Sequence, residues 1–327
     1  MQEKRLPREY IRRIWRAIYE FGLLQPNDRI LIGLSGGKDS LFLLYAMAVL
    51  REHPPFPFEL GAVTIDMGFP EAGVAAKASD SGATSEGSNT SAAPGDNDTG
   101  AAFRDSGTGL AANVTASSAD SDRQILAQYC RDLDVPHIWV PTKIADAALG
   151  ITADNKITGK DPCARCSHFR RAVLAETAVK HGYQKLALGH HHDDAVETFL
   201  LSILYSGQIR TFTPKAHMDR SGITVIRPLS YLREHEIKKG ITLTGFTPLA
   251  SRCPLDCTSQ RAVVKNLLRE LTRDNRFVYT NIAAAMRAGR PCELWPAALS
   301  TQEKRELNFG AWQYKPRQNA GEEIEND

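Results

Sequence analysis

The residues with the clearest chemical potential form a short glycine-rich run near the N-terminus, Ser35-Gly36-Gly37-Lys38-Asp39-Ser40. An apolar run at 30–34 precedes it and is typical of a buried strand, and residues 41–47 follow with helical character. A glycine-rich turn between a strand and a helix directs backbone N–H groups toward an anion, usually a phosphate. Lys38 adds a mobile positive charge, and Ser40 can cap the helix or contact phosphate oxygens. The run therefore predicts a phosphate site.

This run differs from a Walker A loop, which has a glycine, four intervening residues and then Gly-Lys-Ser/Thr. Ile32 stands where the first glycine of that loop would be, and Asp39 follows the lysine. An ordinary strand-to-helix turn is the alternative interpretation. Two glycines, a lysine, an aspartate and two serines at a strand end make a far more specific pattern than such a turn needs.

A second polar run, Gly189-His190-His191-His192-Asp193-Asp194, follows an apolar run at 185–188. Ligands bind at the carboxyl ends of parallel strands, so this loop and Asp66, which ends another apolar run, would flank one nucleotide. We expect Asp193 and Asp194 to bind Mg²⁺, which neutralises phosphate charge and orients the phosphates. Two alternatives remain. Asp193 could cap a helix, or the three histidines could bind zinc, although consecutive histidines on a helix point in different directions.

Two cysteine pairs are the third candidate site. Cys163 and Cys166 have C-x2-C spacing, and Cys253 and Cys257 have C-x3-C spacing. Four thiolates suit a structural zinc ion, whereas three thiolates with one open iron suit a [4Fe-4S] cluster. A redox pair is a further interpretation of the first two cysteines.

The elements that must position these residues alternate along the chain. Apolar runs alternate with helical segments, which predicts a parallel, doubly wound α/β sheet of about five strands, with a basic N-terminal helix and C-terminal helices. The expected strands are 30–34, 58–65, 137–140, 185–188 and 223–226, and residues 141–162 are expected to form a polar connection. The expected helices are 4–22, 41–47, 123–132, 167–181, 195–205, 233–240 and 259–271.

Residues 72–121 differ in composition from the rest of the chain, since almost all are Ala, Gly, Ser, Thr, Asp or Asn. Such a segment cannot bury enough apolar surface to offset its ordering entropy, so we expect a disordered insertion in a crossover connection. The predicted domains are the N-terminal basic helix (1–28), the ATP-binding α/β domain with this insertion (29–250), a cysteine-containing helical segment (251–290) and a tail (291–327).

Charge and composition limit the partners. The formal net charge is only +2, so a nucleic-acid surface would have to be a local patch. The N-terminal helix offers such a patch in Arg5, Arg8, Arg12, Arg13 and Arg16, although a solvated helix face is the alternative. No apolar run approaches the roughly 20 residues that cross a bilayer, and no signal-peptide core opens the sequence. We therefore expect a cytoplasmic protein that does not bind a membrane, in which six cysteines favour metal binding or catalysis over disulfides. The two outside the pairs, Cys130 and Cys292, are expected to be inert.

Together these motifs resemble a known family. The glycine-rich run is similar to the PP-loop of the ATP-pyrophosphatase superfamily, and the whole set resembles the tRNA 2-thiocytidine synthetase (TtcA) family within it. The matching stretches are Leu34 to Ser40, Gly68-Phe69-Pro70-Glu71, Cys163-Ala164-Arg165-Cys166 with Arg170 and Arg171, Leu188 to Asp194, Ile226-Arg227-Pro228-Leu229 and Cys257-Thr258-Ser259-Gln260.

This resemblance implies a tRNA sulfurtransferase that uses ATP, Mg²⁺ and a [4Fe-4S] cluster. ATP would adenylate the C2 oxygen of a tRNA cytidine, and sulfur would replace that oxygen. Lys38 and Asp39 would be catalytic, and Cys163, Cys166 and Cys257 would hold the cluster. The partners implied are tRNA and a cysteine desulfurase or another sulfur donor, and TtcA-like proteins are often homodimers. The ATP-binding residues implied are Ser35, Gly36, Gly37, Lys38, Asp39, Ser40, Asp66, Gly189, His190 and Asp194.

The sequence also departs from the family pattern. The second cysteine pair has one residue more than the family's C-x2-C, Met67 stands where a glutamine is usual, and Leu232 replaces a cysteine. Two other functions fit the same residues. One is an amine-using PP-loop tRNA ligase, similar to lysidine synthetase, with structural zinc on the four cysteines. The other is a non-catalytic protein that binds zinc and RNA.

Overall fold

The computed structural model describes residues 5–69, 118–150, 162–255 and 260–287, together with Gln302 and Arg305. Predictions on Pro70, Glu71, Cys257, Cys292 and nearly all of the 72–121 insertion therefore lie outside the described residues. By its contacts the chain divides into Met1–Met286 and Arg287–Asp327, and the first unit is described below.

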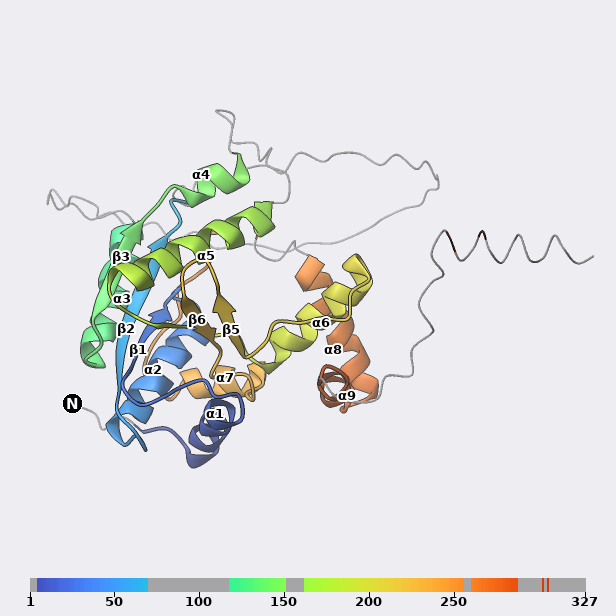
Figure 1. Cartoon of the computed structure of the whole chain (residues 1–327), viewed down its shortest axis with the longest axis horizontal. Coiled ribbons are helices and arrows are strands. Elements are labelled where there is room, and N and C mark those ends of the chain that lie inside the picture. The colour runs from blue at the N-terminus through green and yellow to red at the C-terminus, as the bar shows by residue number, and fades with distance from the viewer. Residues whose placement is uncertain are drawn as a thin grey trace, which may run out of the picture. The chain divides into compact units, whose positions relative to one another are not determined.

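Six strands form one sheet in the order β3-β2-β1-β4-β6-β5 (Figure 1). All neighbouring pairs are parallel except β5 and β6, which are antiparallel. The strands are β1 (Asp28–Gly33), β2 (Phe58–Asp66), β3 (His137–Pro141), β4 (Lys185–Ala187), β5 (Lys215–Met218) and β6 (Ile223–Ile226). The predicted α/β class is confirmed, with a largely parallel sheet. The strand that the sequence did not reveal, β5, lies at an edge and alternates between exposed and half-buried residues, so it lacks the apolar run of a buried strand.

The helices cover both faces of this sheet. They are α1 (Arg8–Glu20), α2 (Lys38–Glu52), α3 (Ser118–Asp132), α4 (Ile144–Leu149), α5 (Pro162–Lys180), α6 (His192–Ser206), α7 (Glu234–Ile241), α8 (Gln260–Asp274) and α9 (Val278–Ala285). Within β1 the side chains alternate: Ile30 and Ile32 pack into the core with α1, α2 and α7, whereas Leu31 packs into the core beneath α5. Each of these three fully buried side chains contributes about 1.5–3 kcal/mol relative to exposure.

The N-terminal helix is present, and its apolar face explains why it forms. Tyr10, Ile14, Ala17 and Ile18 recur at helical spacing and are buried. Two of its predicted phosphate contacts have partners within the protein. Arg13 pairs with Glu236 of α7, and the Arg16 guanidinium lies 4.4 Å from the centre of the Tyr231 ring.

Helix α2 is buried on nearly all sides, which is why it reads as a continuous apolar run and not as an amphipathic helix. Helix α7 crosses it at Gly240, where an added Cβ would lie 2.4 Å from the Phe42 ring. This close approach brings the first residues of α7 near the start of α2, and so near the glycine-rich run.

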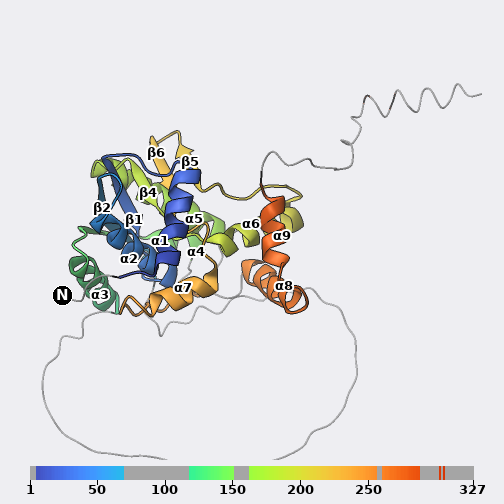
Figure 2. The same cartoon turned by 90° about the horizontal axis from the view of Figure 1, so that it is seen from below.

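Helices α6, α8 and α9 form a further small core around Val196, Val264, Leu268 and Tyr279 (Figure 2). Helix α8 confirms the expected helix at 259–271, while α9 and the short α4 were not predicted. Helix α4 lies in the part expected to be a polar connection, and α3 begins at Ser118, inside the range assigned to the insertion. None of the helices described for this chain is long and apolar enough to cross a membrane.

Candidate functional site

The sheet reverses its strand order between β1 and β4, and ligands of such sheets bind at the carboxyl ends of the strands at this point. The two polar runs follow these two strands. They approach so closely that a Cβ added to Gly189 would lie 2.9 Å from the backbone carbonyl atoms of Asp39. Only glycine fits at this position, and the predicted meeting of the two loops is observed.

The glycine-rich run forms an open anion cradle at the start of α2. No side chain caps the helix at Gly37, so its first-turn N–H groups are not used by a capping residue. The hydroxyls of Ser35 and Ser40 lie 3.1 Å apart, and the Ser40 hydroxyl accepts from the Ser35 N–H. Gly36 has φ +79°, a conformation that favours glycine. A 15-residue helix with this N-terminus favours a phosphate.

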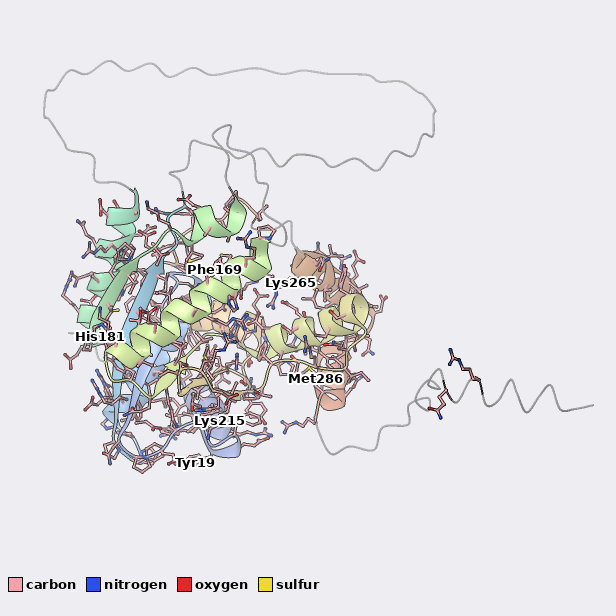
Figure 3. The ribbon with its side chains drawn as sticks, turned by 45° about the horizontal axis from the view of Figure 1, so that its top comes forward. Tyr19, Phe169, His181, Lys215, Lys265 and Met286 are labelled. Carbon is pink, nitrogen blue, oxygen red and sulfur yellow. The ribbon has the colours of Figure 1, made fainter. Side chains whose placement is uncertain are left out.

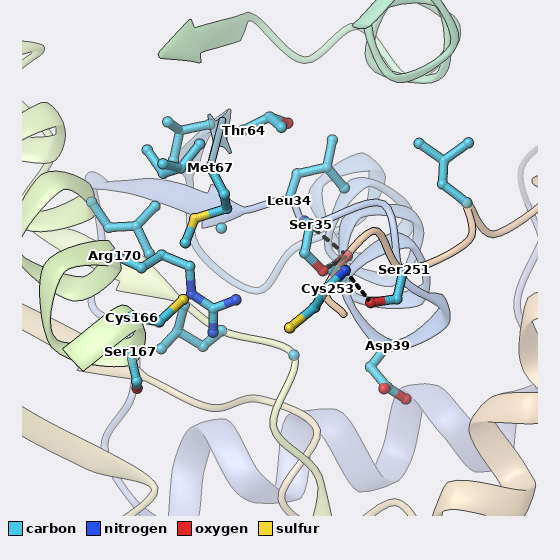
Figure 4. A pocket seen from close by; sticks show the side chains of 18 of the residues that line it. Leu34, Ser35, Asp39, Thr64, Met67, Cys166, Ser167, Arg170, Ser251 and Cys253 are labelled. Carbon is cyan, nitrogen blue, oxygen red and sulfur yellow. Dashed lines mark hydrogen bonds between the residues drawn. The ribbon is translucent and has the colours of Figure 1, made fainter. Parts of the chain in front are cut away.

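A cavity of about 730 Å³ opens beside this cradle (Figure 4). It is large enough for a nucleotide together with part of a second substrate. Its walls come from the ends of β1, β2 and β4, from α3 and α5, and from the segment before α8. The predicted site residues that line it are Ser35, Asp39, Ser40, Asp66, Gly189, His190, Asp194 and Cys166.

Asp39 has a buried oxygen atom that forms no hydrogen bond within the described part of the protein. Its Oδ1 atom is buried and has no hydrogen-bond partner, although it lies 3.7 Å from His191 Nε2. The other oxygen, Oδ2, is 2.9 Å from Lys38 Nζ. A buried carboxylate oxygen without a partner is costly, which is expected where a substrate or metal ion completes the site.

Lys38 is not among the described residues that line the cavity, and it pairs with Glu234 at the start of α7. Its Nζ lies 3.2 Å from Glu234 Oε1. Lys265 of α8, which is labelled in Figure 3, approaches the same oxygen at 2.8 Å. These two lysines lower the pKa of Glu234 to about 2, against the opposing effect of burial. Glu234 thus connects the phosphate cradle with α8, a role that no sequence motif indicated.

Asp193 and Asp194 have different surroundings, although the sequence assigned both to Mg²⁺. Asp193 is absent from the cavity wall formed by the described residues: it pairs with Arg233 and accepts from the Glu234 N–H at 3.1 Å. Asp194 lines the cavity, accepts from the His191 N–H at 2.9 Å and pairs with Arg261 of α8 at 3.1 Å. Only Asp194 is therefore placed to contact a ligand, and it also takes part in a capping box with His191.

An aromatic and basic cluster of His190, Phe212 and Arg227 lines the cavity; the sequence had assigned a role only to His190. The Arg227 guanidinium lies 4.8 Å from the Phe212 ring centre and its Nε donates to His190 Nδ1 at 3.3 Å. Burial lowers the pKa of His190 to about 4 and that of Arg227 to about 10. His190 is therefore neutral near pH 7, and its accepting Nδ1 leaves the ring proton on Nε2. The motif Arg-Pro-Leu could have identified Arg227, whereas nothing in the sequence distinguished Phe212.

Three cysteines border the cavity or its extension. Cys163 and Cys166 are the second and fifth residues of α5, whose first residue is Pro162. Both, with Cys253, line a neighbouring pocket of about 190 Å³, and Figure 4 shows Cys166 and Cys253 beside Arg170. Burial raises the pKa of the Cys166 thiol, and the nearby Cys163 and Cys253 raise it further. Cys130 is fully buried in the core, as predicted, and burial raises the pKa of its thiol to about 12.

Comparison with known proteins identifies the family of this chain. A tRNA-cytidine(32) 2-sulfurtransferase from Geobacter sulfurreducens is 32% identical over 275 residues, which cover 84% of this chain and 86% of that protein. The chain belongs to the tRNA-cytidine(32) 2-sulfurtransferase family. Another relative with this name, from an Anaeromyxobacter species (strain K), is 32% identical over 92% of this chain and 86% of its own length. A family model described as a PP-loop domain matches residues 112–270.

The fold of this sulfurtransferase family member is also similar to a solved structure. The U34-tRNA thiolase NcsA from Methanococcus maripaludis, determined with its [4Fe-4S] cluster, superposes with a TM-score of 0.57 over 93% of this chain and 88% of that one. The sequence identity is 17%, so this likeness concerns the fold.

The buried carboxyl group of Glu197 leads to a prediction about how the stability of this family member depends on pH. Glu197 of α6 is 2% exposed, and its Oε1 has no hydrogen-bond partner. Burial is the largest cause that raises its pKa to about 7; Asp194 and Glu234 act in the same direction, and Lys265 and Arg261 oppose it. Above the unfolded pKa the folded state holds a proton that the unfolded state has lost, so stability falls as the pH rises from about 4.5 to about 7.

Glu197→Gln is expected to remove this loss, because the amide stays neutral. At pH 8 the free energy of unfolding should exceed that of the wild type by about 2–3 kcal/mol, and at pH 4.5 the two should be similar. Urea unfolding at both pH values measures this. An equal difference at both pH values would mean that packing, and not ionisation, distinguishes the two proteins.

Proposed function

We propose that this chain is an ATP-dependent tRNA sulfurtransferase that exchanges the C2 oxygen of a cytidine for sulfur. The observation that carries the proposal is one cavity that combines a phosphate cradle, a buried aspartate oxygen without a partner and cysteine thiols. Membership of the sulfurtransferase family supports it. The cytidine oxygen is a poor leaving group as it stands, so its exchange needs activation, and adenylation by ATP with loss of pyrophosphate supplies this.

In this proposal the nucleotide occupies the end of the cavity at the carboxyl ends of β1, β2 and β4. The N–H groups at the start of α2 and the Ser35 and Ser40 hydroxyls hold the phosphates. Asp39 and Asp194 offer carboxylate oxygens, the ligand type that Mg²⁺ prefers, and the buried Oδ1 of Asp39 fits such an ion. We no longer assign Asp193 to the metal, because Arg233 occupies its carboxylate. Lys38 would leave Glu234 to reach the phosphates.

The cysteines fit a cluster by the chemistry of their donors. Thiolates are the ligands of [4Fe-4S] clusters, and three of them leave one iron open. When bound, such a cluster would carry the donor-derived sulfur that replaces the activated oxygen. Within the described residues no three Cys, His, Asp or Glu side chains are already close enough to hold a metal ion. We propose Cys163 and Cys166 as two ligands and Cys253, which shares their pocket, as the third. Cys257 lies outside the described part of the chain and is the alternative third ligand.

The substrate tRNA would approach over the open side of the cavity. Arg170 and Arg171 line it, and Lys265 and Arg269 of α8 add further positive charge for backbone phosphates. The target base would leave its stack to enter the cavity, as in other base-modifying enzymes. The relatives are named for cytidine 32, which we take as the target. A cysteine desulfurase or another donor would supply sulfur to a cytoplasmic enzyme that could act as a homodimer.

The test uses protein purified without oxygen. We expect about four iron and four acid-labile sulfide per chain. With ATP, Mg²⁺, sulfide and unmodified tRNA, the protein should form AMP and 2-thiocytidine in equal amounts. About one zinc and no sulfide, after anaerobic reconstitution as well, would contradict the cluster and favour a structural metal, as in an amine-using ligase. Absence of AMP formation with intact cluster would contradict the enzyme itself.

A further inference from the structure

The segment that carries Cys253 is fastened to the nucleotide site at several points. We call residues 246–253 the strap. Phe246 stacks on Tyr129 of α3 with ring centres 4.2 Å apart, and the Thr247 N–H donates to the Tyr129 hydroxyl at 3.1 Å. Further along, the Leu249 N–H donates to the Gly36 carbonyl at 2.9 Å. The strap therefore lies across α3 and the phosphate cradle.

Leu249 of the strap also packs closely against Gly36, in addition to the hydrogen bond between their backbones. A Cβ added to Gly36 would lie 2.9 Å from the Leu249 side chain, so the glycine admits the strap as well as a phosphate. A shift of the cradle on ATP binding would consequently move Leu249. Four residues later in the chain comes Cys253.

The last anchor of the strap precedes this cysteine directly. Arg252 pairs with Asp122 of α3, and both side chains are largely buried, 25% and 28% exposed. Asp122 and Arg252 line the main cavity with Cys253, and so they face the reaction space and not bulk solvent alone. Asp122 holds the Arg252 side chain, and Cys253 is the next residue in the chain. The ion pair therefore limits where the Cys253 thiol can lie. The Cys253 N–H also donates a hydrogen bond to the Ser251 hydroxyl at 3.3 Å.

We propose that Asp122 and Arg252 are positioning residues that hold the Cys253 thiol beside Cys166, and that the strap ties this thiol to the phosphate cradle through Gly36. The cluster-ligand role of Cys253 rests on the proposed function, whereas its placement by the ion pair does not. A carboxylate on α3, the first helix after the predicted insertion, thereby controls the geometry of a thiol about 130 residues later in the chain.

A thiol-bridging experiment tests the placement without iron, ATP or tRNA. In full-length, metal-free protein, Cys163, Cys257 and Cys292 are replaced by serine, and Cys130 stays because it is buried. Dibromobimane, which fluoresces strongly once it bridges two nearby thiols, then reports the Cys166–Cys253 pair, confirmed by peptide mass spectrometry. We expect Asp122→Asn and Arg252→Gln to slow bridging several-fold, and the exchange Asp122→Arg with Arg252→Asp to restore it.

Asp132→Asn is the matched control, because it removes a carboxylate from the exposed far end of the same helix. It should bridge like the parent. In protein with all native cysteines, Asp122→Asn should also lower the iron retained after anaerobic reconstitution and change the visible spectrum. Unchanged bridging in Asp122→Asn and Arg252→Gln, or no bridging in the parent, would overturn the proposal. Slowed bridging that the exchange fails to restore would overturn the ion pair as its cause.

Discussion

Cys166→Ala is expected to abolish tRNA thiolation while leaving ATP binding intact. Cys166 borders both the nucleotide cavity and the pocket shared with Cys163 and Cys253. Its thiol therefore lies between the proposed sites of adenylation and of sulfur transfer. Mutation of a residue that hydrogen-bonds a metal ligand typically lowers metal affinity or activity by about 10–100-fold. Removal of the ligand itself should have a larger effect. We expect at least a 10²-fold fall in 2-thiocytidine formation, together with loss of iron and of the visible spectrum.

A set of matched cysteine variants isolates the cause. Cys163→Ala should behave like Cys166→Ala. Cys253→Ala should lose the cluster and Cys257→Ala should keep it, and the reverse result would assign the third ligand to Cys257. Cys130→Ala is the control, since Cys130 is buried in the main core away from the cavity walls. If Cys166→Ala kept full iron and activity, the cluster would have to be held elsewhere.

The fold was largely predictable because its signals are local. Buried parallel strands read as apolar runs, and five of six were found in this way. The strand that was missed, β5, has only one hydrogen-bonded neighbour and alternates between exposed and half-buried residues, so its pairing depends on β6 and not on its own composition. Helix α4 is one and a half turns long, with Ala145 and Leu149 buried by contacts from α5 that no window of sequence contains.

The sequence could predict the loops of the site, but not the residues from elsewhere in the chain that hold the side chains of the site in place. The two polar runs revealed the cradle, Asp39 and Asp194, because strand ends of one parallel sheet must meet. The sequence could not separate Asp193 from Asp194, since the choice depends on Arg233 lying across from one of them. Likewise, the importance of Glu234 and Asp122 comes from partners that are 196 and 130 residues distant and are brought close only by folding.

Asp39→Asn is expected to slow AMP formation by about 10²–10³-fold without destabilising the protein. The buried Oδ1 has no hydrogen-bond partner, so the amide removes charge from the site while weakening only the ion pair with Lys38 and the longer 3.7 Å contact with His191. Removing a group that stabilises charge in the transition state costs about 10²–10³ in kcat. We expect a loss of this size in tRNA-dependent AMP release, a weaker response to Mg²⁺, and a midpoint of thermal unfolding equal to or above that of the wild type.

Asp193→Asn should show the opposite pattern, because its carboxylate is used within the protein. Burial raises the pKa of Asp193, but the hydrogen bond with His192, the charge of Arg233 and the Glu234 N–H lower it to about 2. A lowered pKa contributes stability that is present above the unfolded value of about 3.9 and is lost as the pH falls toward 2. The variant should therefore be less stable than the wild type at pH 7, with the difference closing near pH 2, while kcat per folded molecule changes little. If Asp193→Asn instead lost activity without losing stability, the metal-binding role would return to Asp193, and the unpartnered oxygen of Asp39 would need another ligand.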